Sequence, residues 1–316
     1  MIVGVDVGGT FTDAILIDGE RVFSGKSPST PSDQSEGVMD AVRMVLELAG
    51  AEPAQVKSLA HGMTVATNAL LEGNGARTVL VTTAGFTDIV EIGRQNRADL
   101  YRLRERLGPD VHVSLSHQVV GTFREYERAA TTEVDAALSP LLGGYLARLA
   151  RRCDEAGLPE AAIMQSSGGL TDLETASGHA ALTVLSGPAG GAAAATLVAA
   201  ASSRPNLLCF DMGGTSCDVC VVEDGAVRET GSKSIGGHPM ALPMVDIETV
   251  GAGGGSIAWR DGGGALRVGP RSAGADPGPA CYGNGGTHAT VTDANLLLGN
   301  LERGSDLAGG VSLNFE

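Results

Sequence analysis

Two stretches of the chain place aspartate, glycine and threonine at the same spacing. Residues 6–13 read DVGGTFTD, and residues 211–218 read DMGGTSCD. Exposed backbone N–H groups at a glycine turn, with a threonine hydroxyl beside them, can hold an anion. Aspartate oxygens are hard ligands that suit the Mg²⁺ ion accompanying phosphate groups. This internal repeat therefore predicts two phosphate-binding turns.

Each copy lies between two apolar runs, which is the pattern of a β-hairpin. Residues 1–5 and 14–17 flank the first turn, and residues 207–210 and 219–222 flank the second. Glycine has no side chain, so the tip of such a hairpin can approach a ligand closely. We therefore expect two facing hairpins that hold the phosphates of a nucleotide from both sides.

The residue types assign a role to each repeated position. Asp6 and Asp211 are expected to hold Mg²⁺, through water because this ion dehydrates reluctantly. The alternative is an aspartate that hydrogen-bonds its own turn. For Asp13 and Asp218, structural capping and direct catalysis are equally good interpretations. Asp6, Asp211 and Thr12 are candidate catalytic residues, and the expected phosphate cradle consists of Gly8, Gly9, Thr10, Thr12, Gly213, Gly214 and Thr215.

Composition limits the class of protein. With 43% hydrophobic and 19% charged residues, the 316-residue chain has the balance of a soluble globular protein large enough for two domains. A net charge of −15 and an aromatic content of 3% argue against nucleic acid and anionic membranes as partners. No signal peptide or membrane span is recognisable, and five scattered cysteines fit a reducing compartment, so we expect a cytoplasmic location.

Strands that alternate with helices predict an α/β architecture with parallel pairing. Helical periodicity is found at residues 35–49, from Thr64 onward, at 132–156 with an interruption near Pro140, and at 190–201. Strands are expected at residues 58–61, 77–82, 111–117 and 161–165.

The order of hairpin, small-residue helix and second hairpin resembles the actin-like ATPase superfamily, which includes actin, hexokinase and the heat-shock chaperones. A closer resemblance is to the hydantoinase A / 5-oxoprolinase / acetone carboxylase β-subunit family. The motifs that carry it are VGVDVGGTFTDAIL (3–16), HGMTVATNALLEGNGA (61–76), GFTDIVEIGRQNRADLY (85–101), FREYERAATT (123–132), MQSSGGL (164–170), LSGPAGG (185–191), FDMGGTSCDV (210–219), VGAGGGSIAW (250–259) and GPRSAGADPGPACYGNGG (269–286).

The resemblance implies a two-lobed α/β fold of the actin-like ATPase (ribonuclease H-like) type, with the nucleotide cleft between the lobes. The first lobe would span residues 1–185 and the second residues 186–316. Family members typically carry a longer segment after the motif that ends at residue 101, and they continue to a glycine-rich adenosine-binding motif. The second lobe is therefore expected to be incomplete at its C-terminal end.

The implied function is that of an ATP-dependent hydrolase or carboxylase subunit of the hydantoinase/5-oxoprolinase type. ATP would phosphorylate a carbonyl or amide oxygen of a small-molecule substrate: a hydantoin, a lactam such as 5-oxoproline, or a ketone. A hydantoinase B-like subunit of a hetero-oligomer would then complete hydrolysis or carboxylation. ATP and Mg²⁺ are the implied cofactors, and a monovalent cation is a further candidate. An actin-like nucleotide switch and a small-molecule kinase are the alternatives.

Further candidates lie where a strand ends and a helix begins, the place at which α/β sheets bind ligands. The resemblance favours His61 as a catalytic or substrate-binding residue, and Thr64 and Asn68 as substrate contacts. A buried structural histidine and a helix cap at Thr64 are the alternatives. Arg94 is a candidate clamp for a carboxylate or a phosphate, against the alternative of a solvated ion-pair face.

Overall fold

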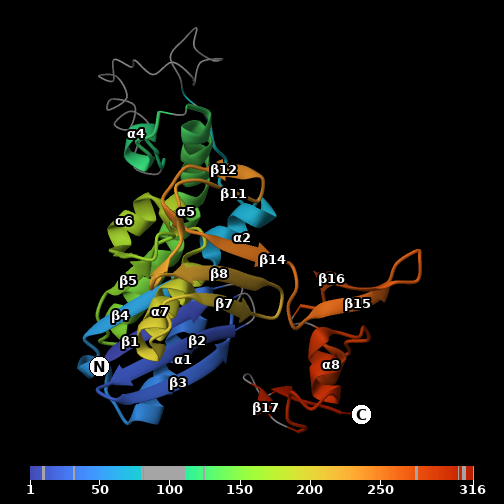
Figure 1. The fold of residues 1–316 in the computed structure, drawn as a ribbon. Coiled ribbons are helices and arrows are strands. Elements are labelled where there is room, and N and C mark those ends of the chain that lie inside the picture. The colour runs from blue at the N-terminus through green and yellow to red at the C-terminus, as the bar shows by residue number, and fades with distance from the viewer. Residues whose placement is uncertain are drawn as a thin grey trace.

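The computed structural model describes residues 1–8, 11–30, 33–79, 81, 111–123, 125–274, 277–304, 306–307 and 311–315. Its helices are α1 (Gln34–Ala49), α2 (Val65–Glu72), α4 (Ser116–Val119), α5 (Glu125–Glu155), α6 (Leu173–Gly178), α7 (Ser186–Ser202) and α8 (Val291–Leu297), with short 3₁₀ turns at Pro53–Gln55, Ala180–Thr183 and Ala280–Tyr282 (Figure 1).

The strands are β1 (Ile2–Val7), β2 (Phe11–Asp18), β3 (Arg21–Pro28), β4 (Ser58–Met63), β5 (Ala161–Met164), β6 (Leu170–Thr171), β7 (Leu207–Met212), β8 (Cys217–Glu223), β9 (Ala226–Val227), β10 (Glu229–Thr230), β11 (Lys233–Ile235), β12 (His238–Met240), β13 (Met244–Val245), β14 (Ile247–Val250), β15 (Ser256–Arg260), β16 (Leu266–Ser272), β17 (Asp306–Leu307) and β18 (Val311–Ser312). The two longest strands, β2 and β3, lie near the N-terminus, and most of the strands after β8 have five residues or fewer (Figure 1).

A six-stranded sheet in the order β3-β2-β1-β4-β5-β6 organises the part of the chain that was expected to form the first lobe. β1 pairs antiparallel with β2 and parallel with β4, and β4 pairs parallel with β5. Because side chains alternate along a strand, Val3, Val5 and Val7 of β1 all point into the core. The α/β architecture with parallel pairing is confirmed.

Helix α5 supplies the longest apolar stripe of that core. Leu138, Leu142, Leu146 and Leu149 are each at most 1% exposed. The helix runs without a break through Pro140, where we expected an interruption. Burial of the leucines on either side compensates for the hydrogen bond that proline removes. No helix among the described residues combines the length and apolar character needed to cross a membrane.

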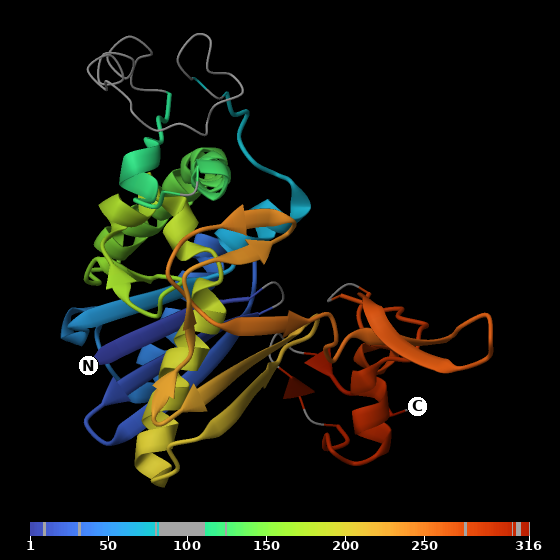
Figure 2. The same cartoon turned by 45° about the horizontal axis from the view of Figure 1, so that its top comes forward.

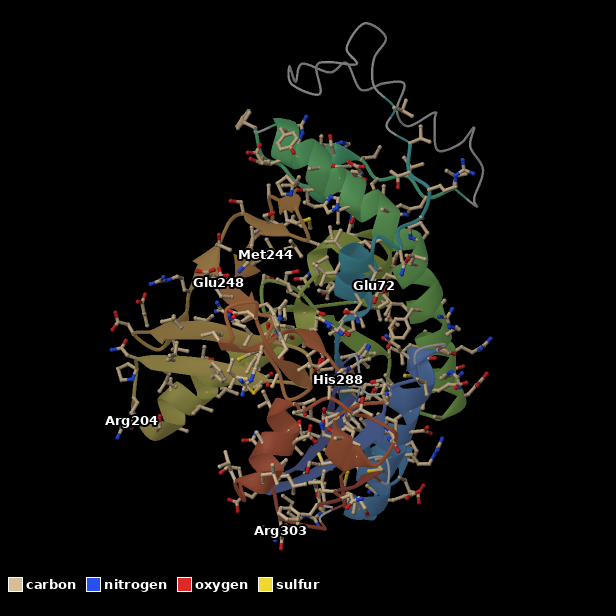
Figure 3. The ribbon with its side chains drawn as sticks, turned by 90° about the vertical axis from the view of Figure 1, so that its right-hand side faces the viewer. Glu72, Arg204, Met244, Glu248, His288 and Arg303 are labelled. Carbon is tan, nitrogen blue, oxygen red and sulfur yellow. The ribbon has the colours of Figure 1, made fainter. Side chains whose placement is uncertain are left out.

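A second sheet, ordered β14-β8-β7, lies across α7 from the first (Figure 2). Helix α7 contacts β4 and β5 on one side and β7 and β8 on the other, so it joins the two sheets. The segment after β10 returns to the first lobe: β12 packs on α5, and Met240 and Met244 belong to the large core cluster (Figures 1 and 3).

Two expected strands are wrong. Residues 77–79 of the expected strand 77–82 are not in a strand, and Val79 is 82% exposed. Residues 112–115 of the expected strand 111–117 have no regular structure, and helix α4 begins at Ser116. Both stretches contain valine, which favours strands, but β4 already has β1 and β5 as neighbours, so this part of the sheet has no free edge for another strand.

Asp33 fixes the start of α1 and ties it to α5. Its carboxylate accepts hydrogen bonds from the Ser35 N–H at 3.2 Å, from Arg152 at 3.0 Å and from Arg148 at 3.3 Å. Burial raises the pKa of Asp33, but the hydrogen bonds from Ser35, Arg152 and Arg148 outweigh it and bring the pKa to about 2.

Replacing Asp33 with Asn keeps a helix-capping acceptor but removes the charge that the two arginines bind. We expect the free energy of unfolding at pH 7 to fall by about 1–2 kcal/mol. Because the pKa is about 2 in the folded chain, below the ordinary 3.8, this stabilisation is fully present above that ordinary value and is lost as the pH falls towards 2. Urea unfolding at pH 7 and at lower pH measures both effects.

The control is Asp40→Asn, which breaks an exposed pair with Arg43 on the same helix and is expected to cost less than about 0.5 kcal/mol. Equal losses in the two variants would contradict a special role for Asp33.

Candidate functional site

The two repeated motifs form hairpins with the same register. In the first hairpin, Asp6 pairs with Asp13 across β1 and β2. In the second, Asp211 pairs with Asp218 across β7 and β8. The sequence repeat is therefore also a repeat of backbone geometry, as predicted.

Each turn is closed by its first glycine. The Gly8 N–H donates to the Phe11 carbonyl at 2.9 Å, and the Gly213 N–H donates to the Ser216 carbonyl at 2.9 Å. These two N–H groups hold their own turns together, so they are not free to bind a phosphate as we expected.

The next positions of the second turn remain open. Gly214 and Thr215 are exposed, and their N–H groups donate to no other described residue. Two adjacent free N–H groups at a turn form a concave anion site. Gly9 and Thr10, the matching positions of the first turn, lie outside the described residues.

The second turn is braced by a glycine loop that we had not assigned to the site. Gly254 donates to the Gly213 carbonyl at 3.0 Å, and Gly255 donates to the Gly214 carbonyl at 2.7 Å. A side chain on Gly253 would begin 2.7 Å from the Gly214 backbone. The signal in the sequence was the run of three glycines at 253–255. Residues without side chains are needed where two backbones approach this closely.

Asp6 sits against two glycines from other elements. A Cβ atom on Gly62 of β4 would lie 3.0 Å from Asp6 Oδ1, and a Cβ on Gly187 of α7 would lie at the same distance. Gly187 belongs to the first turn of α7, where the helix dipole favours a negative charge. The carboxylate of Asp6 therefore lies at the junction of β1, β4 and α7.

Charges from both hairpins reach Asp6. Burial raises its pKa to about 6, with further increases from Asp13, Asp211 and Asp218, while Lys26 acts in the opposite direction. Asp6 is exposed by surface area, but the protein around its carboxylate still disfavours the charged form, and so do the neighbouring aspartates. The structure thus brings the aspartates of the two motifs close enough to act on one another electrostatically, and we call the region between the two hairpins the cleft.

A divalent cation fits this cluster of carboxylates. In the part of the chain that the structure describes, no three acidic, histidine or cysteine side chains form a ready-made metal site. Mg²⁺ does not need one, because one or two carboxylates, phosphate oxygens and water complete its shell. Asp6 and Asp211 are the residues that would hold it, where its charge would relieve the repulsion between the carboxylates.

The second aspartate of each motif is bound by the neighbouring strand. Lys26 of β3 forms an ion pair with Asp13 at 2.7 Å, and Thr249 of β14 donates to Asp218 at 2.6 Å. Burial raises the pKa of Asp218, and the bond from Thr249 opposes that rise. Neither Lys26 nor Thr249 was predicted, because both lie outside the repeated motifs.

Thr12 does not line the open cleft. Its side chain is fully buried, and its hydroxyl lies 3.2 Å from Ser29 Oγ, which donates to the Gly8 carbonyl at 2.7 Å. The register of β2 turns position 12 towards the core. Thr12 therefore supports the turn from behind, and its position gives no support to direct phosphate contact or catalysis.

Thr64 and Asn68 connect elements of the first lobe. Thr64 Oγ1 donates to the Val7 carbonyl at 2.9 Å, and Asn68 Nδ2 donates to Thr64 Oγ1 at 3.3 Å. Thr64 is the N-cap residue of α2 but makes no side-chain cap bond. These contacts hold α2 at the end of β1, and the structure gives no direct support to substrate binding by either residue.

His61 occupies the core and not the cleft. It is 1% exposed, and its Nε2 lies 2.7 Å from the Tyr145 hydroxyl of α5. Burial lowers the pKa of His61 to about 4, against the effect of a hydrogen bond with the Val5 backbone. This arrangement matches the alternative of a buried structural histidine, and the position of His61 gives no support to a role in catalysis or substrate binding. Arg94 lies outside the described residues.

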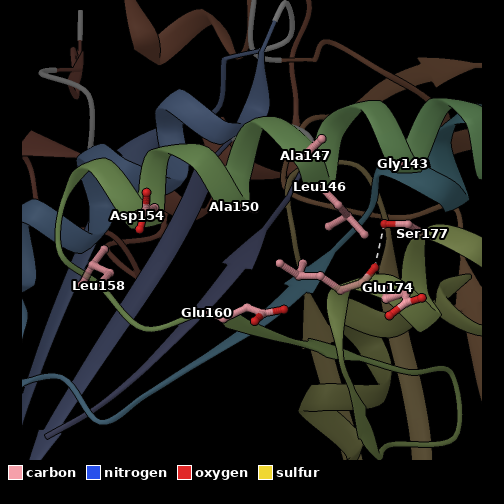
Figure 4. A pocket seen from close by; sticks show the side chains of 10 residues that line it. Gly143, Leu146, Ala147, Ala150, Asp154, Leu158, Glu160, Glu174 and Ser177 are labelled. Atoms are coloured by element: carbon pink, nitrogen blue, oxygen red, sulfur yellow. Dashed lines mark hydrogen bonds between the residues drawn. The ribbon is translucent and has the colours of Figure 1, made fainter.

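A groove of about 520 Å³ lies elsewhere, on the surface between α5 and α6 (Figure 4). Leu146, Leu158 and Leu173 form its apolar floor, and Glu160 and Glu174 are among its polar lining. None of its lining residues belongs to either hairpin, so the chemistry assigned above is not placed there.

The close packing of Gly187 against Asp6 leads to a testable prediction. Gly187→Ala should push the Asp6 carboxylate aside and weaken binding of Mg²⁺-triphosphate by at least about tenfold, the effect of losing one charge-assisted contact. Gly191→Ala in the same helix has nothing within 4 Å of the added methyl. It should bind normally and gain up to about 1 kcal/mol in stability. Calorimetric titration of both variants with Mg²⁺-tripolyphosphate decides, and equal affinities would contradict the role of Gly187.

The buried His61 makes a second prediction. Its pKa of about 4 in the folded chain lies below the ordinary 6.5, so the unfolded chain binds the extra proton between these values. Stability should therefore fall as the pH drops from 6.5 to 4, by up to about 3 kcal/mol. In His61→Gln this part of the pH dependence should be absent. The control His238→Gln, at an exposed position, should behave like the wild type, and an unchanged slope in His61→Gln would contradict the structural role.

Known proteins resemble the chain over almost its whole length. It is 34% identical over 390 aligned positions to caprolactamase subunit alpha of Pseudomonas jessenii, covering 98% of the chain and 56% of that protein. With 5-oxoprolinase 1 of Arabidopsis thaliana it shares 32% identity, covering 93% of the chain and 31% of that protein. The chain thus spans about half, or less, of these relatives.

Solved structures agree with these matches. The crystal structure of ATP-dependent caprolactamase from Pseudomonas jessenii superposes with a TM-score of 0.79 at 32% identity, covering 99% of the chain and 57% of the other. Nucleotide-free acetone carboxylase gives a TM-score of 0.82 at 22% identity, with the same coverage, and this supports the fold alone. The expected fold class is confirmed.

Two family models cover the described hairpins and the helix between them. The N-terminal region of hydantoinase/oxoprolinase matches residues 2–165, and hydantoinase/oxoprolinase itself matches residues 128–313. The chain belongs to the hydantoinase/oxoprolinase family.

Proposed function

We propose that this chain is the nucleotide-binding part of an ATP-dependent hydrolase or carboxylase subunit of the hydantoinase/oxoprolinase type. The observation that carries the proposal is the convergence of two equivalent aspartate–glycine hairpins on one cleft. Charges of Asp211 and Asp218 from the second hairpin act on Asp6 of the first. We propose the lobe boundary at residues 185/186, and the start of α7 at Ser186 supports this choice.

The free N–H groups of Gly214 and Thr215 would receive phosphate oxygens of ATP. Asp6 and Asp211 would hold Mg²⁺, whose charge offsets that of the phosphates. Helix α7 contacts both sheets, so a change in their mutual position would open or close the cleft. Closure would keep water away from the phosphates and limit unproductive hydrolysis.

The chemistry is transfer of the terminal phosphoryl group. A carbonyl or amide oxygen of the substrate attacks the terminal phosphorus, and the bond to the leaving ADP oxygen breaks. The amide N–H proton, or an α-proton of a ketone, passes to solvent, so the product is an O-phosphorylated imidate or an enol phosphate. Such transfers depend on positioning and charge neutralisation, which the two hairpins are built to supply. In the amide case the carbon that bears the phosphorylated oxygen is a better electrophile, and the phosphate is a good leaving group when water adds in a second reaction.

Substrate and partner follow from the chemistry and from the relatives. A lactam, as in the relatives named caprolactamase and 5-oxoprolinase, is the favoured substrate class, with hydantoins and ketones in the same chemical range. Several relatives are named as subunits, which favours a hetero-oligomer with a hydantoinase B-like partner that adds water or carboxylate. A cytoplasmic location and a monovalent cation at the phosphates complete the proposal.

The test is ATP consumption by the chain together with its partner subunit. Caprolactam, 5-oxoproline, hydantoin and acetone are supplied in turn, and ADP and organic products are measured. Release of ADP that depends on one of these compounds supports the proposal. Turnover that ignores all of them favours a nucleotide switch, and a stable phosphorylated product favours a small-molecule kinase.

Asp211→Asn should reduce substrate-dependent ADP release by at least about 100-fold, because one carboxylate that would hold Mg²⁺ loses its charge. Asp224→Asn lies on the same hairpin at the end away from the cleft, in a left-handed conformation that Asn accepts. This control should retain wild-type turnover. Normal turnover in Asp211→Asn, with circular dichroism showing an intact fold, would overturn the metal assignment.

A further inference from the structure

We propose that Lys26 binds the terminal phosphate group of the nucleotide. When the nucleotide binds, the ammonium group of Lys26 exchanges its ion pair with Asp13 for one with this phosphate. The inference rests on the proposed function and adds one residue to its binding machinery. Lys26 lies on β3, outside both glycine motifs, and no part of the repeat identifies it.

The backbone at Lys26 is held firmly against α1. A side chain on Gly25 would begin 3.0 Å from Val45 Cγ1, so β3 packs closely on the helix there. Ser27 Oγ donates to the Gly37 carbonyl at 2.9 Å in a buried bond. Because side chains alternate along a strand, Lys26 points to the opposite face. Its attachment point is therefore fixed, while its long side chain remains able to move.

The ammonium group stands beside the first glycine turn. Lys26 Nζ lies 2.7 Å from Asp13 Oδ1 and 5.2 Å from the centre of the Phe11 ring. Phe11 is the first residue of β2, directly after that turn. Lys26 pairs with Asp13 on β2, and Asp13 pairs with Asp6 on β1, so Lys26 lies two strands from the carboxylate assigned to the metal.

Stability does not account for a lysine at this position. The side chains of Lys26 and Asp13 are 45% and 47% exposed, and such exposed pairs contribute little to folding. In the second hairpin the equivalent register position on β14 is Thr249, which is uncharged and satisfies Asp218 with a hydroxyl. An uncharged residue therefore suffices at this register position, so the strand pairing itself does not require the charge of Lys26.

The balance of charges around Asp6 indicates a role for the charge of Lys26. Among the described residues with the largest electrostatic effects on Asp6, three are aspartates and Lys26 alone is positive. A polyphosphate entering beside these carboxylates needs a mobile cation that can follow its outermost oxygens. A lysine ammonium on a flexible stem suits that task better than a rigid arginine fork. The terminal phosphate is the group that ATP has and ADP lacks, so a comparison of the two nucleotides isolates its binding.

The experiment compares Mg²⁺-ATP with Mg²⁺-ADP by calorimetric titration of the wild-type chain and Lys26→Met. The variant keeps the apolar stem and loses the charge. We expect its affinity for Mg²⁺-ATP to fall roughly 10- to 100-fold, the effect of one charge-assisted hydrogen bond, and its affinity for Mg²⁺-ADP to change less than about twofold. Lys26→Arg should recover part of the ATP affinity.

Two further variants separate phosphate binding from a structural role. Lys57→Met removes the same charge at the opposite end of the first sheet, next to the start of β4, and should bind both nucleotides like the wild type. Asp13→Asn releases Lys26 and removes a negative charge from the cleft, so it should bind Mg²⁺-ATP more tightly. If Lys26 served only to hold Asp13, Asp13→Asn would weaken binding as Lys26→Met does.

Equal losses for the two nucleotides in Lys26→Met, or no loss for either, would overturn the inference while leaving the proposed function in place. A wild-type chain that binds neither Mg²⁺-ATP nor Mg²⁺-ADP would contradict the proposed function itself, and the inference with it.

Discussion

The repulsion between aspartates of the two hairpins is the constraint on which the rest of the structure depends. Asp6 lies against Gly62 and Gly187, and the charges of Asp211 and Asp218 act on its carboxylate. Folding alone does not reward such an arrangement, because crowded like charges raise the free energy of the folded state. A cation and a polyphosphate, bound together, relieve it. The cleft is therefore organised for a ligand that combines both.

The surrounding elements keep that constraint in place. The first sheet and α5 form a large core that fixes β1 and β4, while α7 packs on both sheets and brings Gly187 to Asp6. The glycine loop at 253–255 braces the second turn from behind and leaves the N–H groups of Gly214 and Thr215 free. The two hairpins have the same backbone register but differ in the residue that binds their second aspartate, Lys26 in one and Thr249 in the other. They therefore offer different chemistry to the two sides of a ligand.

The hairpins, their register and the α/β architecture were predictable because a repeated motif flanked by apolar runs allows few other structures. The direction of individual side chains was harder. Thr12 lies in the motif but faces the core, because a strand alternates faces regardless of residue type. His61 was expected at the end of a strand, where α/β sheets bind ligands, but β4 continues to Met63. The Tyr145 hydroxyl, distant in sequence, lies within hydrogen-bond distance of its ring nitrogen. Lys26 was missed because its partner Asp13 becomes its neighbour only through strand pairing.

The most direct test of the central claim is a crystal structure of the chain with Mn²⁺ and a non-hydrolysable ATP analogue, with the metal located by its anomalous scattering. Our account predicts an anomalous peak at the carboxylates of Asp6 and Asp211 and phosphate density at the turn of Gly214 and Thr215. A triphosphate bound elsewhere, for example in the groove between α5 and α6, or a metal that contacts neither aspartate, would contradict it.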